Sequence, residues 1–189
     1  MKVLLDACVL YPTVMREVLL GVAAAGLFQP LWSDRILEEW ARATIKLGPG
    51  AEAQARGEVA LLRAAWPGAA VSYAPSLEAR LWLPDPADTH VLAAAIAGHA
   101  DLVVTLNAKD FPQNILREEG LDRVDPDLFL LGLFEAQPDT VAAAAEAVRH
   151  EAERLSGEAW DIRRLMKKAH LPRFGKALAA ANPTADPAA

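Results

Sequence analysis

Apolar residues occur along the chain in short runs and in longer segments of helical period. The run at residues 2–5 predicts a first strand that ends at Asp6. From residue 13 to residue 25 apolar side chains recur every three or four positions, which predicts a helix with Thr13 as its N-cap. Gly26 suits the position just after that helix. Asp6 therefore precedes the expected cap, and a polar strand end is its simplest interpretation.

A second helix is expected after the extended residues 30–32, with Ser33 as its cap. Its predicted apolar face consists of Ile36, Trp40, Ala43 and Leu47. At about 100° per residue, Glu39 falls at the edge of this face, whereas Glu38 points to the opposite side. If one of these two acids faces the interior, the helical geometry selects Glu39.

The most informative stretch is residues 84–112, PDPADTHVLAAAIAGHADLVVTLNAKDFP. Asp85 has the position of an N-cap, Pro86 that of the first helical residue, and Asp88 lies in the first turn of a helix over residues 90–98. Capping alone accounts for Asp85, but it leaves Asp88 unexplained because the cap is already supplied.

A buried strand is expected over residues 102–105, and polar residues follow it at once. These are Asn107 and Asp110. Open α/β sheets bind their ligands where parallel strands end and helices begin. We therefore interpret the polar side chains around this helix and strand as part of a site.

The remaining pattern predicts an α/β domain followed by helices. A helix over residues 51–66, an edge strand over 70–73 and a helical turn over 76–83 precede the central stretch. Beyond Pro112 only helices are expected, over residues 125–135, 138–155, 158–169 and 171–180. This predicts an α/β domain at 1–135, a helical extension at 136–181 and a disordered tail at 182–189.

Composition narrows the class of protein. Of 189 residues, 53% are hydrophobic, but no apolar run is long enough for a membrane span, and no secretory signal precedes the first strand. A single cysteine, Cys8, indicates a reducing, cytoplasmic setting. The net charge of −6 argues against a protein that coats nucleic acid by overall basicity. His90 and His99 form no zinc motif and are interpreted as packing or surface residues.

One segment reverses the acidic character of the chain. The helix around residue 165 carries four cations, Arg163, Arg164, Lys167 and Lys168. The simpler interpretation of these cations is a solvated helix face, and the more specific one is contact with a nucleic-acid backbone.

The dispersed acids have a common chemical interpretation. Parallel topology would bring the four acids and one amide to one sheet edge; these are Asp6, Glu39, Asp88, Asn107 and Asp110. Clustered carboxylates repel one another unless a cation lies between them, and an all-oxygen ligand set favours Mg²⁺ or Mn²⁺. Such ions serve phosphodiester hydrolysis without a covalent intermediate.

Four motifs together resemble those of PIN-domain ribonucleases, and in particular VapC-type toxins with a helical C-terminal extension. The motifs are LLDACVLYP, SDRILEEW, LPDPADTHVLAAAI and VVTLNAKDFP, and they cover about the first 130 residues in order. The resemblance implies a three-layer α/β/α fold with a central parallel sheet and cleavage of RNA that leaves 5′-phosphate and 3′-hydroxyl ends. It also implies homodimerisation and inhibition by a small cognate antitoxin.

Carried over by residue, the resemblance makes Asp6, Glu39, Asp88 and Asp110 the catalytic, metal-binding acids, with Asn107 as a further ligand. Asp85, Thr105 and Arg16 are implied as supporting residues, Arg16 at substrate phosphate. Cys8 departs from the asparagine that relatives commonly carry there, and the neutral Asn107 leaves a one-metal or a two-metal mechanism open.

Two other functions remain as alternatives. A haloacid-dehalogenase-like phosphatase would need a second Asp two residues after Asp6, where this chain has Cys8. A non-catalytic PIN-like binding module would have no use for a clustered set of carboxylates, which destabilises a fold.

Overall fold

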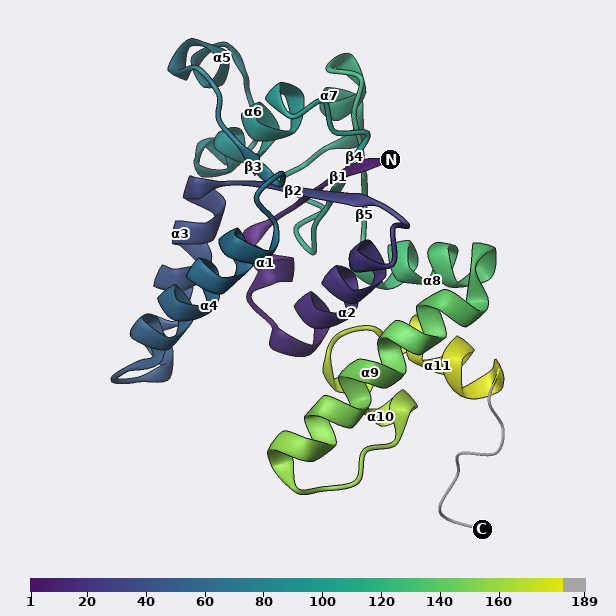
Figure 1. Cartoon of the computed structure of the whole chain (residues 1–189). Coiled ribbons are helices and arrows are strands. Elements are labelled where there is room, and N and C mark those ends of the chain that lie inside the picture. The colour runs from purple at the N-terminus through teal and green to yellow at the C-terminus, as the bar shows by residue number, and fades with distance from the viewer. Residues whose placement is uncertain (182–189) are drawn as a thin grey trace. The chain divides into compact units, whose positions relative to one another are not determined.

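The computed structural model describes residues 1–181, and its centre is a five-stranded parallel sheet (Figure 1). The strands are β1 (Lys2–Leu5), β2 (Gln29–Ser33), β3 (Ala70–Val71), β4 (Leu102–Val104) and β5 (Asp122–Val124), in the order β3-β2-β1-β4-β5. The chain thus moves outward from β1 to β3 and then returns to the other side of β1. This reversal creates a switch point at the carboxyl ends of β1 and β4.

Strands were predicted at the positions of β1, β3 and β4, whereas residues 30–32 of β2 were expected only to be extended, and β5 was not predicted. The expectation that only helices follow Pro112 is wrong, because α7 (Gln113–Glu118) leads into β5. Each residue of β5 is only half-buried at the sheet edge, and two of the three are charged. An edge strand pairs through its backbone on one side only, so its side chains carry little of the apolar pattern that reveals a central strand.

Helices of the first compact unit lie on both sides of this sheet. The unit comprises residues 1–11 and 28–124. In Figure 1, α5 (Pro75–Arg80), α6 (Thr89–Ala97) and α7 lie on one side, and α1 (Ala7–Leu10), α3 (Asp34–Ala43) and α4 (Ala51–Ala65) lie on the other. Right-handed crossovers require this arrangement, because the direction of strand addition reverses after β3. The layers are therefore in the α/β/α arrangement, with a central parallel sheet, that was expected.

Burial of α6 explains its sequence. Residues 89–95 are all buried, and α6 contacts both β1 and β2. Small alanine side chains let this helix lie close to the sheet, and a helix buried on all sides has no polar face to show. On the opposite side, Ile36 and Trp40 of α3 are buried as predicted, whereas Leu47 is 65% exposed. Leu47 leaves the predicted face because α3 ends at Ala43 and a 3₁₀ turn, η1 (Ile45–Leu47), follows.

The second compact unit is entirely helical. It combines residues 12–27 with residues from 125 onward, and its helices are α2 (Thr13–Ala24), α8 (Pro126–Ala136), α9 (Pro138–Ser156), α10 (Ile162–Lys168) and α11 (Pro172–Ala181). Helix α2 packs on α9, where Gly21 faces Ala144. The predicted boundary after residue 135 therefore does not coincide with the division between the compact units. The predicted tail at 182–189 lies outside the described residues.

Two contacts join the helices of this unit. The buried carboxylate of Asp127, on α8, accepts hydrogen bonds from the backbone N–H groups of Arg173 (3.0 Å) and Phe174 (2.8 Å) at the start of α11. Gly175 of α11 lies so close to α10 that an added Cβ would be 2.7 Å from the Cβ of Met166. Both contacts hold α11 against the unit at its first turns.

The predicted N-cap of α2 and the predicted role of Asp6 both require correction. Helix α2 begins at Thr13 itself, and its N-cap is Pro12, which provides no side-chain acceptor. Asp6 is not a plain strand end, because its carboxylate caps the short helix α1 that immediately follows β1. Within residues 1–181, no helix combines the length and the apolar character needed to cross a membrane.

Candidate active site

Asp6 lies at the switch point of the sheet, directly after β1. Its backbone N–H donates to the carbonyl of Val104, the last residue of β4. The carboxylate is 7% exposed, and its Oδ1 accepts from the N–H of Ala7 at 2.6 Å. Its Oδ2 accepts from the hydroxyl of Thr105 at 2.7 Å. Two adjacent strand ends therefore fix the orientation of one carboxylate, as the parallel topology predicts.

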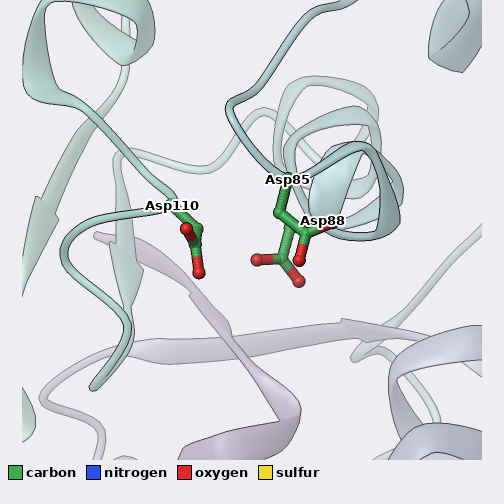
Figure 2. A group of neighbouring side chains, drawn as sticks. All are labelled: Asp85, Asp88 and Asp110. Atoms are coloured by element: carbon green, nitrogen blue, oxygen red, sulfur yellow. The ribbon is translucent and has the colours of Figure 1, made fainter.

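Three further carboxylates approach one another near this point. Asp85 and Asp88 belong to the 3₁₀ turn that precedes α6, η2 (Pro86–Asp88) and its cap, and Asp110 belongs to the loop after β4. One oxygen of each lies within 4.8 Å of the others, and Figure 2 shows the acids of the turn facing Asp110. Asp85 also caps η2 by accepting from the N–H of Ala87, so it combines the predicted capping role with a place in the cluster.

The electrostatics of Asp88 connect this trio with the other predicted acids. Partial burial, followed by repulsion from Asp6, Asp85, Asp110 and Glu39, raises the pKa of Asp88 from 3.8 to about 6. Four other carboxylates therefore lie close enough to Asp88 to disfavour its charged form. Carboxylates this close repel one another, and a cation bound among them would relieve that repulsion.

Glu39 reaches the site from α3, on the side that the helical periodicity selected. Its Oε1 lies 2.8 Å from Nε2 of His90, a histidine that is fully buried in the first turn of α6. The ring nitrogen approaches at ion-pair distance but not in the direction of a hydrogen bond. Glu38, in contrast, is bound on the surface by Arg42 and Arg56, which lower its pKa to about 2.

Asn107 contacts the cluster directly. Its side-chain amide donates to Oδ2 of Asp88 at 3.2 Å, and its backbone N–H donates to the hydroxyl of Thr105 at 3.0 Å. Thr105 is buried, and its hydrogen bond to Asp6 links the loop after β4 with the end of β1. The loop after β4 and the turn before α6 are thus tied together through side chains that the sequence placed at strand ends and helix starts.

Comparison with known protein families identifies the family to which this domain belongs. The model of the PIN domain matches residues 2–109, which is more than half of the chain. The chain belongs to the PIN-domain family. All acids described above except Asp110, which directly follows the matched region, lie within that PIN domain.

A curated relative is similar to part of the PIN domain. A putative ribonuclease VapC50 of Mycobacterium tuberculosis is 38% identical over 56 residues, which is 30% of this chain and 33% of the relative. The match therefore spans about a third of the length of that relative. No solved structure matches the chain.

Cys8 is the main departure of this PIN domain from the expected pattern. Its thiol donates to Oδ2 of Asp6 at 3.1 Å and accepts from the N–H of Leu106 at 3.3 Å. Burial, and then the charge of Asp6, raises the pKa of the Cys8 thiol to about 12. A thiol with such a pKa is not a nucleophile at neutral pH. The role of Cys8 is instead to orient Asp6 through a hydrogen bond.

Two further residues, His90 and Arg35, lie near the acids, but little in the sequence indicated that they would. His90 was interpreted as a packing residue, but it abuts Glu39, and its place two residues after Asp88 in the same turn was the only hint. Arg35, one turn before Glu39 in α3, lies 3.7 Å from Glu39, pairs with Glu78 and donates to the carbonyl of Ala87. A second cation, Lys109, lies beside the trio, with its Nζ 4.0 Å from Oδ2 of Asp110.

The other predicted residues lie in the helical unit. Arg16 of α2 is 4% exposed and its Nε pairs with Glu17 at 3.2 Å. The contact of Arg16 with substrate phosphate stays a prediction. The four cations of α10 are all exposed, which suits either of their two interpretations.

Proposed function

We propose that this PIN-domain protein is a metal-dependent endoribonuclease and the toxin of a type II toxin–antitoxin pair. The observation that supports this most directly is the group of Asp85, Asp88 and Asp110, in which one oxygen of each lies within 4.8 Å of the others. Burial, and then repulsion from four neighbouring carboxylates, raises the pKa of Asp88 there to about 6. Family membership supports the nuclease class, and the partial similarity to a VapC-type ribonuclease supports RNA as the substrate. A toxin of this kind would act in the cytoplasm as a homodimer with a small antitoxin as its partner.

The donor set suits a hard divalent cation. Asp85, Asp88 and Asp110 offer converging oxygens, with Asp6, Glu39 and Asn107 around them. Carboxylate and amide oxygens are ligands of Mg²⁺ and Mn²⁺, and the mutual repulsion at Asp88 would be relieved by such an ion. Bound there, Mg²⁺ or Mn²⁺ would neutralise charge on a phosphate oxygen and lower the pKa of a water molecule for in-line attack.

The residues of the chain have distinct roles in this proposal. Asp6, Glu39, Asp88 and Asp110 are the catalytic acids. Thr105, Cys8 and the backbone N–H of Ala7 hold Asp6 in one orientation through hydrogen bonds. Asn107 holds Asp88 and thereby connects the turn before α6 with the loop after β4.

The proposal is tested with the purified full chain and a fluorescent single-stranded RNA. We expect cleavage in Mg²⁺ or Mn²⁺ and none in EDTA, and a loss of about 10²-fold or more in rate for Asp6→Asn and for Asp88→Asn. Glu135→Gln, which removes an exposed carboxylate of α8, is the matched control and should cleave normally. Cleavage that persists in EDTA or in both variants would place the activity elsewhere.

A titration with Mn²⁺ separates this proposal from a non-catalytic PIN-like module. Saturable binding with thermal stabilisation, lost in Asp88→Asn, is expected of the nuclease. A module without a metal site would show neither effect. The phosphatase alternative has no support, because the family match is to PIN domains and Cys8 occupies the position of its second Asp.

A further inference from the structure

The helical unit contains a pocket that the proposed nuclease does not use. The pocket has a volume of about 450 Å³ and lies among the start of α2, the end of α9 and helix α10. Its apolar lining comprises Pro12, Val14, Leu155, Trp160, Leu165 and Ala169. Leu155 is 70% exposed although it lines the pocket, so a large aliphatic surface faces solvent there. Cavities of this size and character ordinarily receive a ligand or a side chain.

Helix α10, which contributes to the pocket wall, carries positive charge that no carboxylate in the described part of the chain pairs with. Within residues 1–181, the α10 cations Arg163, Arg164, Lys167 and Lys168 form no ion pair with a carboxylate. The neighbouring acids of α9 do not compensate them, because Glu153 pairs with Arg149 and Glu151 pairs with Arg154. Asp161 caps α10, and its carboxylate accepts from the backbone N–H of Arg164 rather than from a cationic side chain. In a chain with a net charge of −6, four exposed cations without an ion pair among the described residues, on a seven-residue helix, are a local anion-attracting surface.

Trp160 joins the pocket to these cations. The ammonium of Lys168 lies 4.9 Å from the centroid of the Trp160 ring, and the guanidinium carbon of Arg164 lies 5.6 Å from it. The indole N–H donates to the hydroxyl of Ser156, which itself donates to the carbonyl of Ala152. Trp160 is therefore held in place, and Lys168 belongs both to the pocket wall and to the cationic rim.

Either a nucleic acid or an acidic protein would suit the positive charge of α10, and the contacts of Trp160 distinguish between them. A nucleobase needs a free aromatic face and polar groups that read its edge. Here two cations lie over the indole ring, the Ser156 hydroxyl is already used, and most of the remaining wall is aliphatic. An aliphatic or aromatic side chain of a protein, flanked by carboxylates, satisfies both the apolar wall and the cationic rim.

We propose that this pocket is a docking site for an acidic amphipathic segment of a partner protein. One or two large apolar side chains of the segment enter the pocket beside Leu155 and Leu165. Its Asp or Glu residues pair with Lys168 and Arg164 at the rim. Recognition of this kind is the helix-in-groove mode, in which spaced apolar anchors supply affinity and charge supplies orientation. The proposal does not depend on whether the PIN domain cleaves RNA.

The test uses the full chain as the target of a displayed library of random peptides. We expect the selected peptides to combine large apolar residues with Asp or Glu. Synthetic copies should bind Leu155→Asp and the double variant Arg164→Glu, Lys168→Glu at least about tenfold more weakly than the unaltered chain. These side chains are exposed, so the fold is expected to persist, and circular dichroism and thermal unfolding verify it.

Matched controls lie in the same unit. Leu128→Asp alters an exposed leucine of α8 (44% exposed), and Lys176→Glu reverses an exposed charge of α11; both should bind the peptides normally. Selection of no peptide that depends on Leu155 would overturn the proposal. Binding of a single-stranded uridine-rich RNA that is lost in the same two pocket variants, without any such peptide, would also overturn it and assign the surface to nucleic acid.

Discussion

Replacement of Asp88 by asparagine should make the metal-free protein more stable, although it removes a proposed catalytic acid. In the folded chain the pKa of Asp88 is raised from 3.8 to about 6, by burial first and then by four neighbouring carboxylates. The folded state therefore holds the Asp88 proton more tightly than the unfolded chain does. Stability consequently falls as pH rises from about 4 through about 6, and it stays reduced above that range.

The magnitude follows from the size of this rise. A rise in pKa from 3.8 to about 6 corresponds to about 3 kcal/mol at neutral pH. Asp88 is only partly buried, so solvent screens its interactions, and we expect about 1 to 1.5 kcal/mol in practice. Asparagine has nearly the same shape and keeps an oxygen that accepts from the Asn107 amide. The variant thus loses the repulsion and little else.

The assay is thermal and urea unfolding in EDTA at about pH 7.5 and about pH 4. At the higher pH the melting temperature of Asp88→Asn should exceed that of the unaltered chain by about 2 to 6 °C. At the lower pH, where the folded state keeps Asp88 protonated, the difference should nearly vanish. In saturating Mn²⁺ the order should invert, because the unaltered chain gains the free energy of binding and the variant does not.

Either of two results would refute this reasoning. A variant that is less stable in EDTA at about pH 7.5 would show that Asp88 contributes favourable contacts rather than net repulsion. An equal response of both proteins to Mn²⁺ would show that the ion does not bind at this cluster. Glu135→Gln removes an exposed carboxylate outside the site and should change stability by less than about 0.5 kcal/mol under every condition.

Three other predictions concern local structure. Gly175→Ala should lower the free energy of unfolding by about 1 to 3 kcal/mol in urea titrations, because the added Cβ would overlap α10. Gly132→Ala has open space around it and should raise the free energy of unfolding by about 0.5 kcal/mol or more. Asp127→Ala should cost about 2 to 4 kcal/mol, because two N–H groups at the start of α11, one of them on buried Phe174, would lose their acceptor. The exposed Asp139→Ala should cost less than half as much. Iodoacetamide should alkylate Cys8 far more slowly at about pH 7.5 than an unstructured thiol; rapid alkylation would contradict a pKa of about 12.

Local patterns in the sequence were sufficient for the inner part of the fold. The apolar runs of β1 and β4 and the buried alanines of α6 indicate a parallel α/β sheet, because central strands and their covering helices bury both faces. Strand-end positions then selected Asp6 and Asp110, and helical periodicity selected Glu39 over Glu38. These inferences depend only on backbone geometry that repeats along a chain.

The tertiary structure alone decided which side chains meet. Asp85 has the sequence signature of a simple cap, yet it also faces Asp88 and Asp110, and buried His90 reaches Glu39 from another helix. Segments 12–27 and 125–181 form one helical unit although residues 28–124 lie between them in the sequence, which no local pattern predicts. Contacts between distant segments depend on how strands and helices pack in three dimensions, and the period of an individual helix or strand contains no information about its neighbours.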